Sequence, residues 1–97
     1  MIPHSLTETV LNKIELFEQV ALSWGIIDVG ISHQEVEKYA AEAIELHQNE
    51  LDLFLSTDDV INHLKDLGLI YLFGAGFNQE NGKYRSRMAE TVRLSFL

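Results

Sequence analysis

The stretch Ser56–Phe73, STDDVINHLKDLGLIYLF, contains a helix start, a helix stop and a strand in direct succession. Ser56 or Thr57 can accept a backbone N–H as an N-cap, and the two aspartates that follow suit the positive end of a helix dipole. Apolar residues then recur at spacings of three and four, as on the buried face of a helix; they are Val60, Ile61, Leu64 and Leu67. Gly68 follows them, and a glycine there can adopt the left-handed conformation that ends a helix.

The residues after this helix predict a β-hairpin. Leu69–Phe73 is too short for a second helix and is rich in strand-forming residues. Asn81-Gly82 is the strongest short hairpin signal, and a returning strand from Tyr84 to about Met88 would complete the hairpin. A helix, a strand, a turn and a second strand in that order, within a small helical domain, indicate a winged helix-turn-helix.

A long helix is predicted near the N-terminus. Ser5–Glu8 fits a capping box, in which the serine caps the helix and the glutamate reaches back to it. Eight apolar residues then follow a helical period as far as Gly25; they are Leu6, Val10, Leu11, Ile14, Phe17, Val20, Ala21 and Trp24. Trp24 is therefore expected to lie in the core, with its indole N–H bonded to a carbonyl group.

A second helix is predicted to begin at a repeat of the capping box, Ser32–Glu35, and to run to about His47. Its core residues would be Val36, Tyr39, Ala40, Ala43 and Ile44. The apolar connector 26–30 could add a strand to the sheet, and 51–55 fits a strand, a helical turn or a packed loop. We therefore predict an α+β, mostly helical protein: a single three-helix winged helix-turn-helix-like domain, residues 1–97, with a C-terminal β-hairpin wing.

Length and composition limit the class of protein. A chain of 97 residues forms one domain with a single core, and the lack of cysteine excludes disulfides and cysteine-based zinc sites. No apolar run reaches the ~18 residues of a membrane span, and no basic-then-apolar leader opens the chain, so we expect a cytoplasmic protein without membrane contact. The apolar ending Leu94–Leu97 either packs on the body of the domain or marks the point where a longer protein continues, and we favour the second.

Charge is distributed unevenly along the chain. The net charge is −8, but residues 1–82 carry −11 and residues 83–97 carry +3. On a strand, Arg85 and Arg87 would share one face, where two guanidinium groups could bind phosphates beside the ring of Tyr84. Alternatively, these arginines pair with acidic residues of the first two helices or of a partner.

The candidate contacts to a protein partner or a nucleic-acid backbone are Lys83, Arg85, Arg87, Arg93 and Phe77. Phe77 is included because it falls among polar residues in the hairpin turn, where it either folds back or meets a partner. The third helix is a weaker candidate, because its outward residues would be mostly acidic and would repel phosphates; they are Asp58, Asp59, Asn62, His63, Lys65 and Asp66.

Catalytic and metal-binding patterns are not found in the sequence. There is no arrangement of nucleophile, base and orienting group, and no GxGxxG or phosphate-loop motif. His33 and Glu37 are four residues apart, with His47 near the end of the same helix. A pair of ligands at that spacing falls short of the three or four that a metal site needs. We therefore predict no catalytic residues, no metal and no cofactor.

The run Tyr84–Leu94, YRSRMAETVRL, resembles a segment found ahead of the motor domain in large bacterial superfamily-two (DEAD/DEAH-like) helicases, several of them linked to phage defence. The resemblance covers about eleven residues. It implies an N-terminal accessory domain from which the chain continues into a helicase core. No ATPase activity or catalytic residue carries over, because the chain has neither a Walker lysine nor a DEAD-type acidic box.

The same resemblance offers a different structure for the C-terminal segment. Ser86 would cap a helix that begins at Arg87, so that Arg85 and Arg87 would no longer share a strand face. The inward residues of this helix would be Met88, Ala89, Val92 and Phe96, and its ion pairs would be Arg87–Glu90 and Glu90–Arg93.

Three functions remain as hypotheses. The first is a non-catalytic accessory or docking domain, N-terminal to a helicase motor, that contacts a protein partner or the adjoining helicase domain and touches a nucleic-acid backbone weakly. The second is a stand-alone winged-helix regulator that binds DNA through Lys83, Arg85 and Arg87. The third is an acidic protein-interaction or DNA-mimic module.

Overall fold

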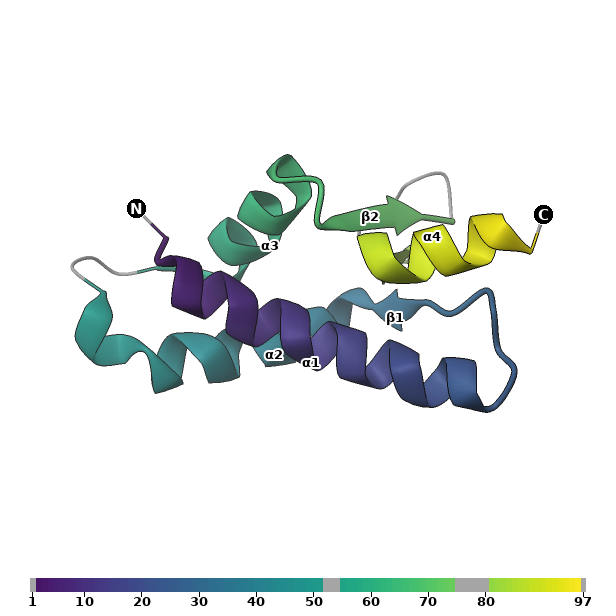
Figure 1. The fold of residues 1–97 in the computed structure, drawn as a ribbon. Helices are drawn as coiled ribbons and strands as arrows, with labels where there is room; N and C mark the ends of the chain where they lie inside the picture. Colours follow the sequence, from purple (N-terminus) through teal and green to yellow (C-terminus); the bar gives the residue numbers. More distant parts are fainter. Residues whose placement is uncertain (1, 52–54, 75–80, 97) are drawn as a thin grey trace.

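A computed structural model of the chain describes residues 2–51, 55–74 and 81–96. Within those ranges the protein is α+β and mostly helical, with four α-helices and one small antiparallel sheet (Figure 1). In chain order the elements are α1 (His4–Ser23), β1 (Ile31–Ser32), α2 (His33–Leu46), the 3-10 turn η1 (Gln48–Glu50), α3 (Thr57–Asp66), β2 (Ile70–Phe73), β3 (Lys83–Ser86) and α4 (Arg87–Ser95). No helix in the described ranges is both long and apolar enough to cross a membrane.

The sheet has the strand order β1-β3-β2, with both pairs antiparallel. The β2–β3 hairpin pairs Ile70 with Ser86 at one end and Phe73 with Lys83 at the other. On the opposite edge of β3, Ile31 of β1 pairs with Tyr84. The third strand therefore lies directly after the connector 26–30, one residue beyond the segment from which we expected it.

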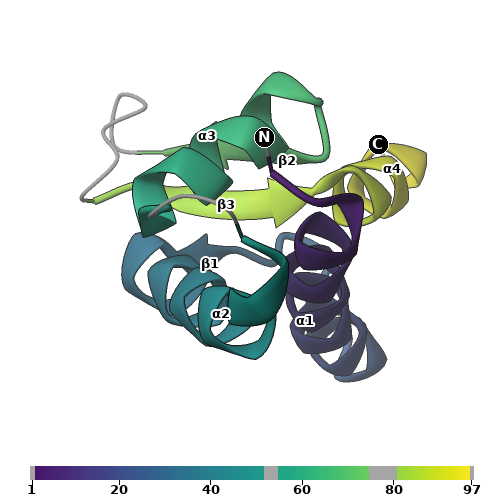
Figure 2. The same ribbon diagram turned by 90° about the vertical axis from the view of Figure 1, so that its left-hand side faces the viewer.

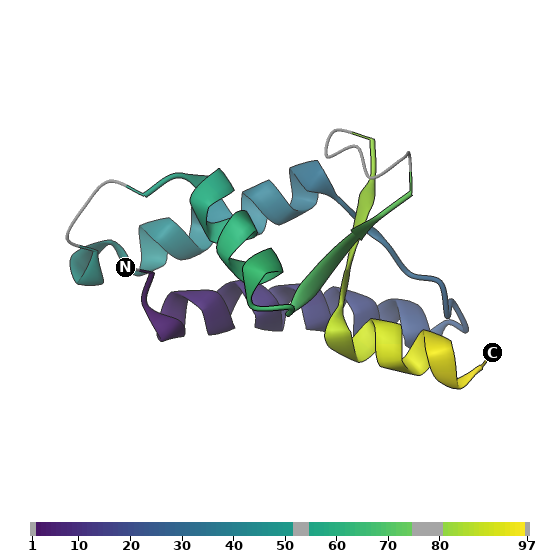
Figure 3. The same ribbon diagram turned by 90° about the horizontal axis from the view of Figure 1, so that it is seen from above.

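The core is built where α1, α2 and α3 meet the sheet. Figures 1 and 3 show α1 and α2 side by side and running in opposite directions, and the end view in Figure 2 shows α4 beside α1. The buried core residues are Leu6, Val10, Ile14, Ile31, Val36, Ala40, Ala43, Val60, Ile61, Leu64, Ile70 and Tyr84. All three predicted helices thus contribute apolar residues to one core.

Most helix signals of the opening stretch are confirmed, but Leu67, which was predicted on the buried face, is the C-cap residue of α3 and is 49% exposed. Ser56 Oγ accepts the N–H of Asp59 (3.1 Å), and the Asp59 carboxylate accepts the N–H of Ser56 (3.2 Å), which completes a capping box. Gly68 has a φ of +70°, the left-handed conformation that was predicted to end this helix. The cap of α2 is also confirmed, because Ser32 Oγ accepts the N–H of Glu35 (3.2 Å).

Two predictions for the first helix are wrong. The helix begins at His4 with Pro3 as its N-cap, so Ser5 lies inside the first turn and does not cap it. Pro3 is the last residue with extended backbone, with φ near −62°, and the helix begins directly after it. Trp24 is not in the core: it is the C-cap residue, and 81% of its surface is exposed.

The C-terminal segment adopts the second of its two expected structures. β3 ends at Ser86, not near Met88, because Ser86 Oγ accepts the N–H of Ala89 (3.2 Å) and so caps α4. Met88 and Val92 are half-buried and Ala89 is fully buried, as expected, but Phe96 is exposed.

Two other details of this region can be compared with the expectations. The predicted Glu90–Arg93 ion pair is present (3.5 Å), whereas Arg87–Glu90 is not among the ion pairs of the described residues. Residues 52–54 lie outside the described residues, so the open question about 51–55 stays open.

Candidate functional site

The basic residues of the C-terminal segment do not form a single surface. Lys83 on β3 and Arg87 at the start of α4 are exposed, while Arg85 between them is buried, with 5% of its surface accessible. The prediction that Arg85 and Arg87 share a strand face is therefore wrong, since the strand ends between them. Phe77 lies outside the described residues.

The guanidinium group of Arg85 contacts three parts of the fold. Its NH2 group donates to an oxygen of Asp28 (2.5 Å) and its NH1 group to Glu90 (2.6 Å), while Nε donates to the carbonyl of Val29 (3.3 Å). It also lies 3.8 Å from the centre of the Phe73 ring, close enough for a cation–π contact. Arg85 therefore joins the α1–β1 connector to the sheet and to α4.

Arg93 joins the same network from the outside. Its Nε lies 3.3 Å from Asp28 and its NH1 3.5 Å from Glu90, and its side chain is one-third exposed. The alternative that the arginines pair with the chain's own acids thus describes Arg85 and Arg93. The acids come from the connector and α4, however, and not from α1 and α2 as we had expected. Lys83 and Arg87 remain on the surface as candidate contacts.

α1 carries two rows of residues at a spacing of four, and they have opposite environments. The first row is Leu6, Val10, Ile14 and Glu18, and every member is buried. The second row is Leu16, Val20 and Trp24, and every member is exposed. Each residue advances about 100° around an α-helix, so the second row, which is offset by two residues from the first, lies on nearly the opposite side of the helix at each level.

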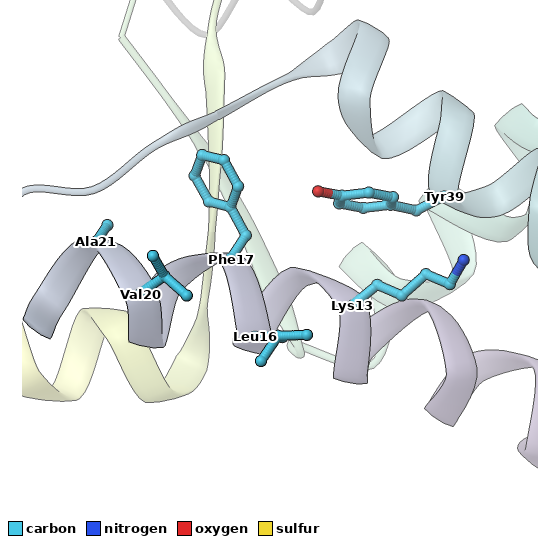
Figure 4. A pocket seen from close by; sticks show the side chains of 6 residues that line it. All are labelled: Lys13, Leu16, Phe17, Val20, Ala21 and Tyr39. Atoms are coloured by element: carbon cyan, nitrogen blue, oxygen red, sulfur yellow. The ribbon is translucent and has the colours of Figure 1, made fainter.

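The exposed row belongs to a larger apolar surface, which we call the α1 outer face. It consists of Leu16, Phe17, Val20, Trp24, Ile26 and Ile27, each between 40% and 81% exposed. Leu16, Phe17 and Val20 of this face line a hollow of about 440 Å³, in which Tyr39 of α2 points toward Phe17 (Figure 4). At the far end of the hollow, Lys13 forms an ion pair with Glu42 of α2. The surface is therefore apolar in its middle and charged at one edge.

The side of α1 that faces the core carries a buried carboxylate near the α1 outer face. Glu18 is fully buried and accepts two hydrogen bonds from Ser86, one from its N–H (2.8 Å) and one from its Oγ (2.5 Å). Burial raises the pKa of the Glu18 carboxyl above its usual value, although the bonds from Ser86 act in the opposite direction. Because Ser86 also caps α4, Glu18 fixes the junction between β3 and α4.

α3 presents an acidic surface, as predicted. Asp58, Asp59, Asn62 and Asp66 are exposed, and Lys65 is half-buried. A helix with this exposed charge is a poor match for the phosphates that flank a DNA groove.

One group of side chains could approach a single cation. His33 Nε2 lies 3.3 Å from Glu37, and ligand atoms of His33, Glu37 and Asp58 all fall within 4.8 Å of one another. The other ring nitrogen of His33, Nδ1, lies 3.0 Å from the hydroxyl of Tyr84, whose pKa is raised by burial and by the nearby Asp58 and Glu37 carboxylates. Asp58 comes from a different helix, so the sequence spacing of His33 and Glu37 could not reveal it.

His47, the other histidine that we considered as a ligand, lies elsewhere. Its Nε2 is 2.9 Å from Thr9 Oγ1, near the opposite end of α2.

Comparisons with known proteins identify no relative of this chain. No family model, curated protein or solved structure matches it.

The α1 outer face was not predicted from the sequence, because Phe17, Val20 and Trp24 continue the helical period of the buried residues and Trp24 was expected in the core. A signal was present at Glu18, four residues after Ile14 in the row that enters the core. A charged residue in the buried row shows that this row is no longer apolar at Glu18. The apolar residues Val20 and Trp24, which follow Glu18 on the second row, then indicate a second apolar surface.

Proposed function

We propose that this chain is a non-catalytic docking domain that binds a protein through the α1 outer face. The observation that carries the proposal is the exposure of six large apolar residues on adjoining turns of α1 and the connector that follows it. Contiguous apolar patches of this kind on soluble proteins mark sites of protein interaction. Trp24, the most exposed of them, belongs to a residue type that is enriched among the residues that dominate binding energy.

The arrangement of the elements supports a winged helix-turn-helix version of this docking domain. The order α1-β1-α2-α3-β2-β3, with β3 between β1 and β2, is compatible with such a domain, in which α3 would be the recognition helix. The exposed carboxylates of α3 disfavour its insertion into a DNA groove, and the burial of Arg85 removes one of the three cations that a DNA-binding wing would use. These observations favour docking to protein over the regulator hypothesis.

The resemblance of Tyr84–Leu94 to the helicase segment supports an accessory role beside a helicase motor in the cytoplasm. In that setting the exposed Lys83 and Arg87 would make weak contacts to a nucleic-acid backbone, while the α1 outer face would hold the protein partner.

Site-specific photo-crosslinking in cells of the source organism tests the proposal. A photoreactive amino acid replaces Trp24 in one variant, the exposed Asn62 of α3 in a second and the exposed Leu46 of α2 in a third. We expect one protein adduct at position 24 that disappears when Val20→Glu is added, and no comparable adduct at position 46. Nucleic-acid adducts at position 62, without a protein adduct at position 24, would contradict docking and favour the DNA-binding regulator.

A salt titration with duplex and single-stranded DNA gives an independent check. A docking domain whose exposed cations in this region are Lys83 on β3 and Arg87 on α4 predicts weak binding even at low salt. Tight binding with a steep salt slope that flattens in Lys83→Ala and Arg87→Ala would support the regulator instead.

A further inference from the structure

The area of the α1 outer face can be compared with what one side of a protein interface needs. Its six residues are 40–81% exposed, and taking the about 150–250 Å² of an aromatic side chain for every one of them gives an upper limit on the order of 600 Å² of apolar surface. This lies at the upper end of the about 300–600 Å² found for the largest patch on a monomer. A standard interface covers about 800 Å² on each partner, so a polar rim would complete it.

The pattern of residues along α1 is complementary to itself. If two α1 helices cross in opposite directions with Val20 at the twofold axis, Leu16 of each copy faces Trp24 of the other. In the same arrangement Glu15, which is half-buried and lines a hollow with residues of α4, faces Gly25 and not another acid. A twofold contact requires this property, because the same surface must serve on both sides.

Charge limits where two copies of this chain can meet. Each chain carries a net charge of −8, so two copies repel each other over most of their surfaces. Residues 16–27 contain a single charged residue, Glu18, and its side chain is fully buried. The six residues of the α1 outer face therefore carry no charge, and Asp28, the carboxylate that follows Ile27, is paired with Arg85 and Arg93.

We propose that the partner of the α1 outer face is a second copy of this chain, which forms a twofold dimer through antiparallel α1 helices. This assignment rests on the docking function proposed above and names its partner. Because the contact is apolar and the chains repel each other, added salt strengthens the dimer by screening the repulsion. A contact to nucleic acid would weaken with salt instead.

Sedimentation equilibrium of the purified chain tests the assignment over a range of concentrations. We expect a monomer–dimer equilibrium in the micromolar range or tighter, and a dissociation constant that falls as salt is added. Val20→Glu and Leu16→Ala should each weaken the dimer, with Val20→Glu raising the dissociation constant at least about 30-fold. Leu46→Ala removes an equally exposed leucine at the other end of the molecule and should leave the constant unchanged. Circular dichroism spectra and unfolding curves show that each variant is folded.

The outcomes separate this assignment from the docking function. A chain that stays monomeric at every concentration, or a dimer that Val20→Glu does not weaken, overturns the second copy as partner. If such a monomer still forms the protein adduct at position 24, the docking function stands with a different partner. If that adduct is also missing, both proposals fall.

Discussion

The two halves of α1 have the same apolar periodicity and opposite environments. In the first half, Leu6, Val10 and Ile14 fill the core against α2 and α3. In the second half, the buried position is a carboxylate, Glu18, and the apolar residues Leu16 and Val20 point to solvent. The amphipathic pattern is thus inverted between one end of the helix and the other.

The difference shows that an apolar row predicts burial but does not identify what covers it. The first half is covered by elements of the same chain. The second half extends past the core, toward the end where β3 and α4 meet α1 through the polar contact between Glu18 and Ser86. In our account, a second chain covers the apolar side that is left.

The largest expected effect compares equivalent truncations in the two halves. Ile14→Ala should lower the free energy of unfolding by about 2–4 kcal/mol, because it leaves a cavity in a fully packed site. Leu16→Ala, at a residue that is 63% exposed, should change it by no more than about 0.5 kcal/mol. Urea denaturation of dilute, monomeric protein measures both. Equal losses for the two variants would show that the outer half also packs within its own fold.

The next effect concerns Arg85, which bonds to the connector between α1 and β1. Arg85→Ala should lower the free energy of unfolding by about 2–3 kcal/mol, since Glu90 and Asp28 would lose hydrogen bonds from a charged donor. Arg87→Ala is the matched control, and its exposed side chain predicts a change within about 0.5 kcal/mol. Thermal or urea unfolding is the measurement. A small effect for Arg85 would mean that the buried network does not position Ile26 and Ile27.

A smaller effect is the pH dependence of the free energy of unfolding that comes from Glu18. Its pKa is raised in the folded state, so the folded chain keeps this proton to a higher pH than the unfolded chain does. The stabilising contribution of the protonated carboxyl is complete below the usual pKa and is lost as the pH rises through the raised value. The stability of the wild type should therefore fall relative to Glu18→Gln as the pH rises from below 4.5. A difference that does not vary with pH would contradict a raised pKa.

Helix caps, turns and strands could be predicted from the sequence more fully than the burial and contact partners of individual side chains. Capping at Ser56, the left-handed Gly68 and the strand after it were predictable, because caps and turns depend on neighbouring residues. The environment of Trp24 was not, since burial is decided by elements that lie far away in the chain. For the same reason the charge of Arg85 suggested a surface contact, although its partners Asp28 and Glu90 draw it inside.

Trp24 is the sole tryptophan of the chain, so its fluorescence reports directly on the outer half of α1. Quenching of this fluorescence by acrylamide, measured over a range of protein concentrations, tests whether a second chain covers the α1 outer face. A dimer through this face predicts strong quenching in dilute protein that weakens as the concentration rises, and strong quenching at all concentrations in Val20→Glu. Weak quenching in the most dilute protein would place Trp24 within its own fold, and strong quenching that never changes with concentration would leave the α1 outer face without a second copy to cover it.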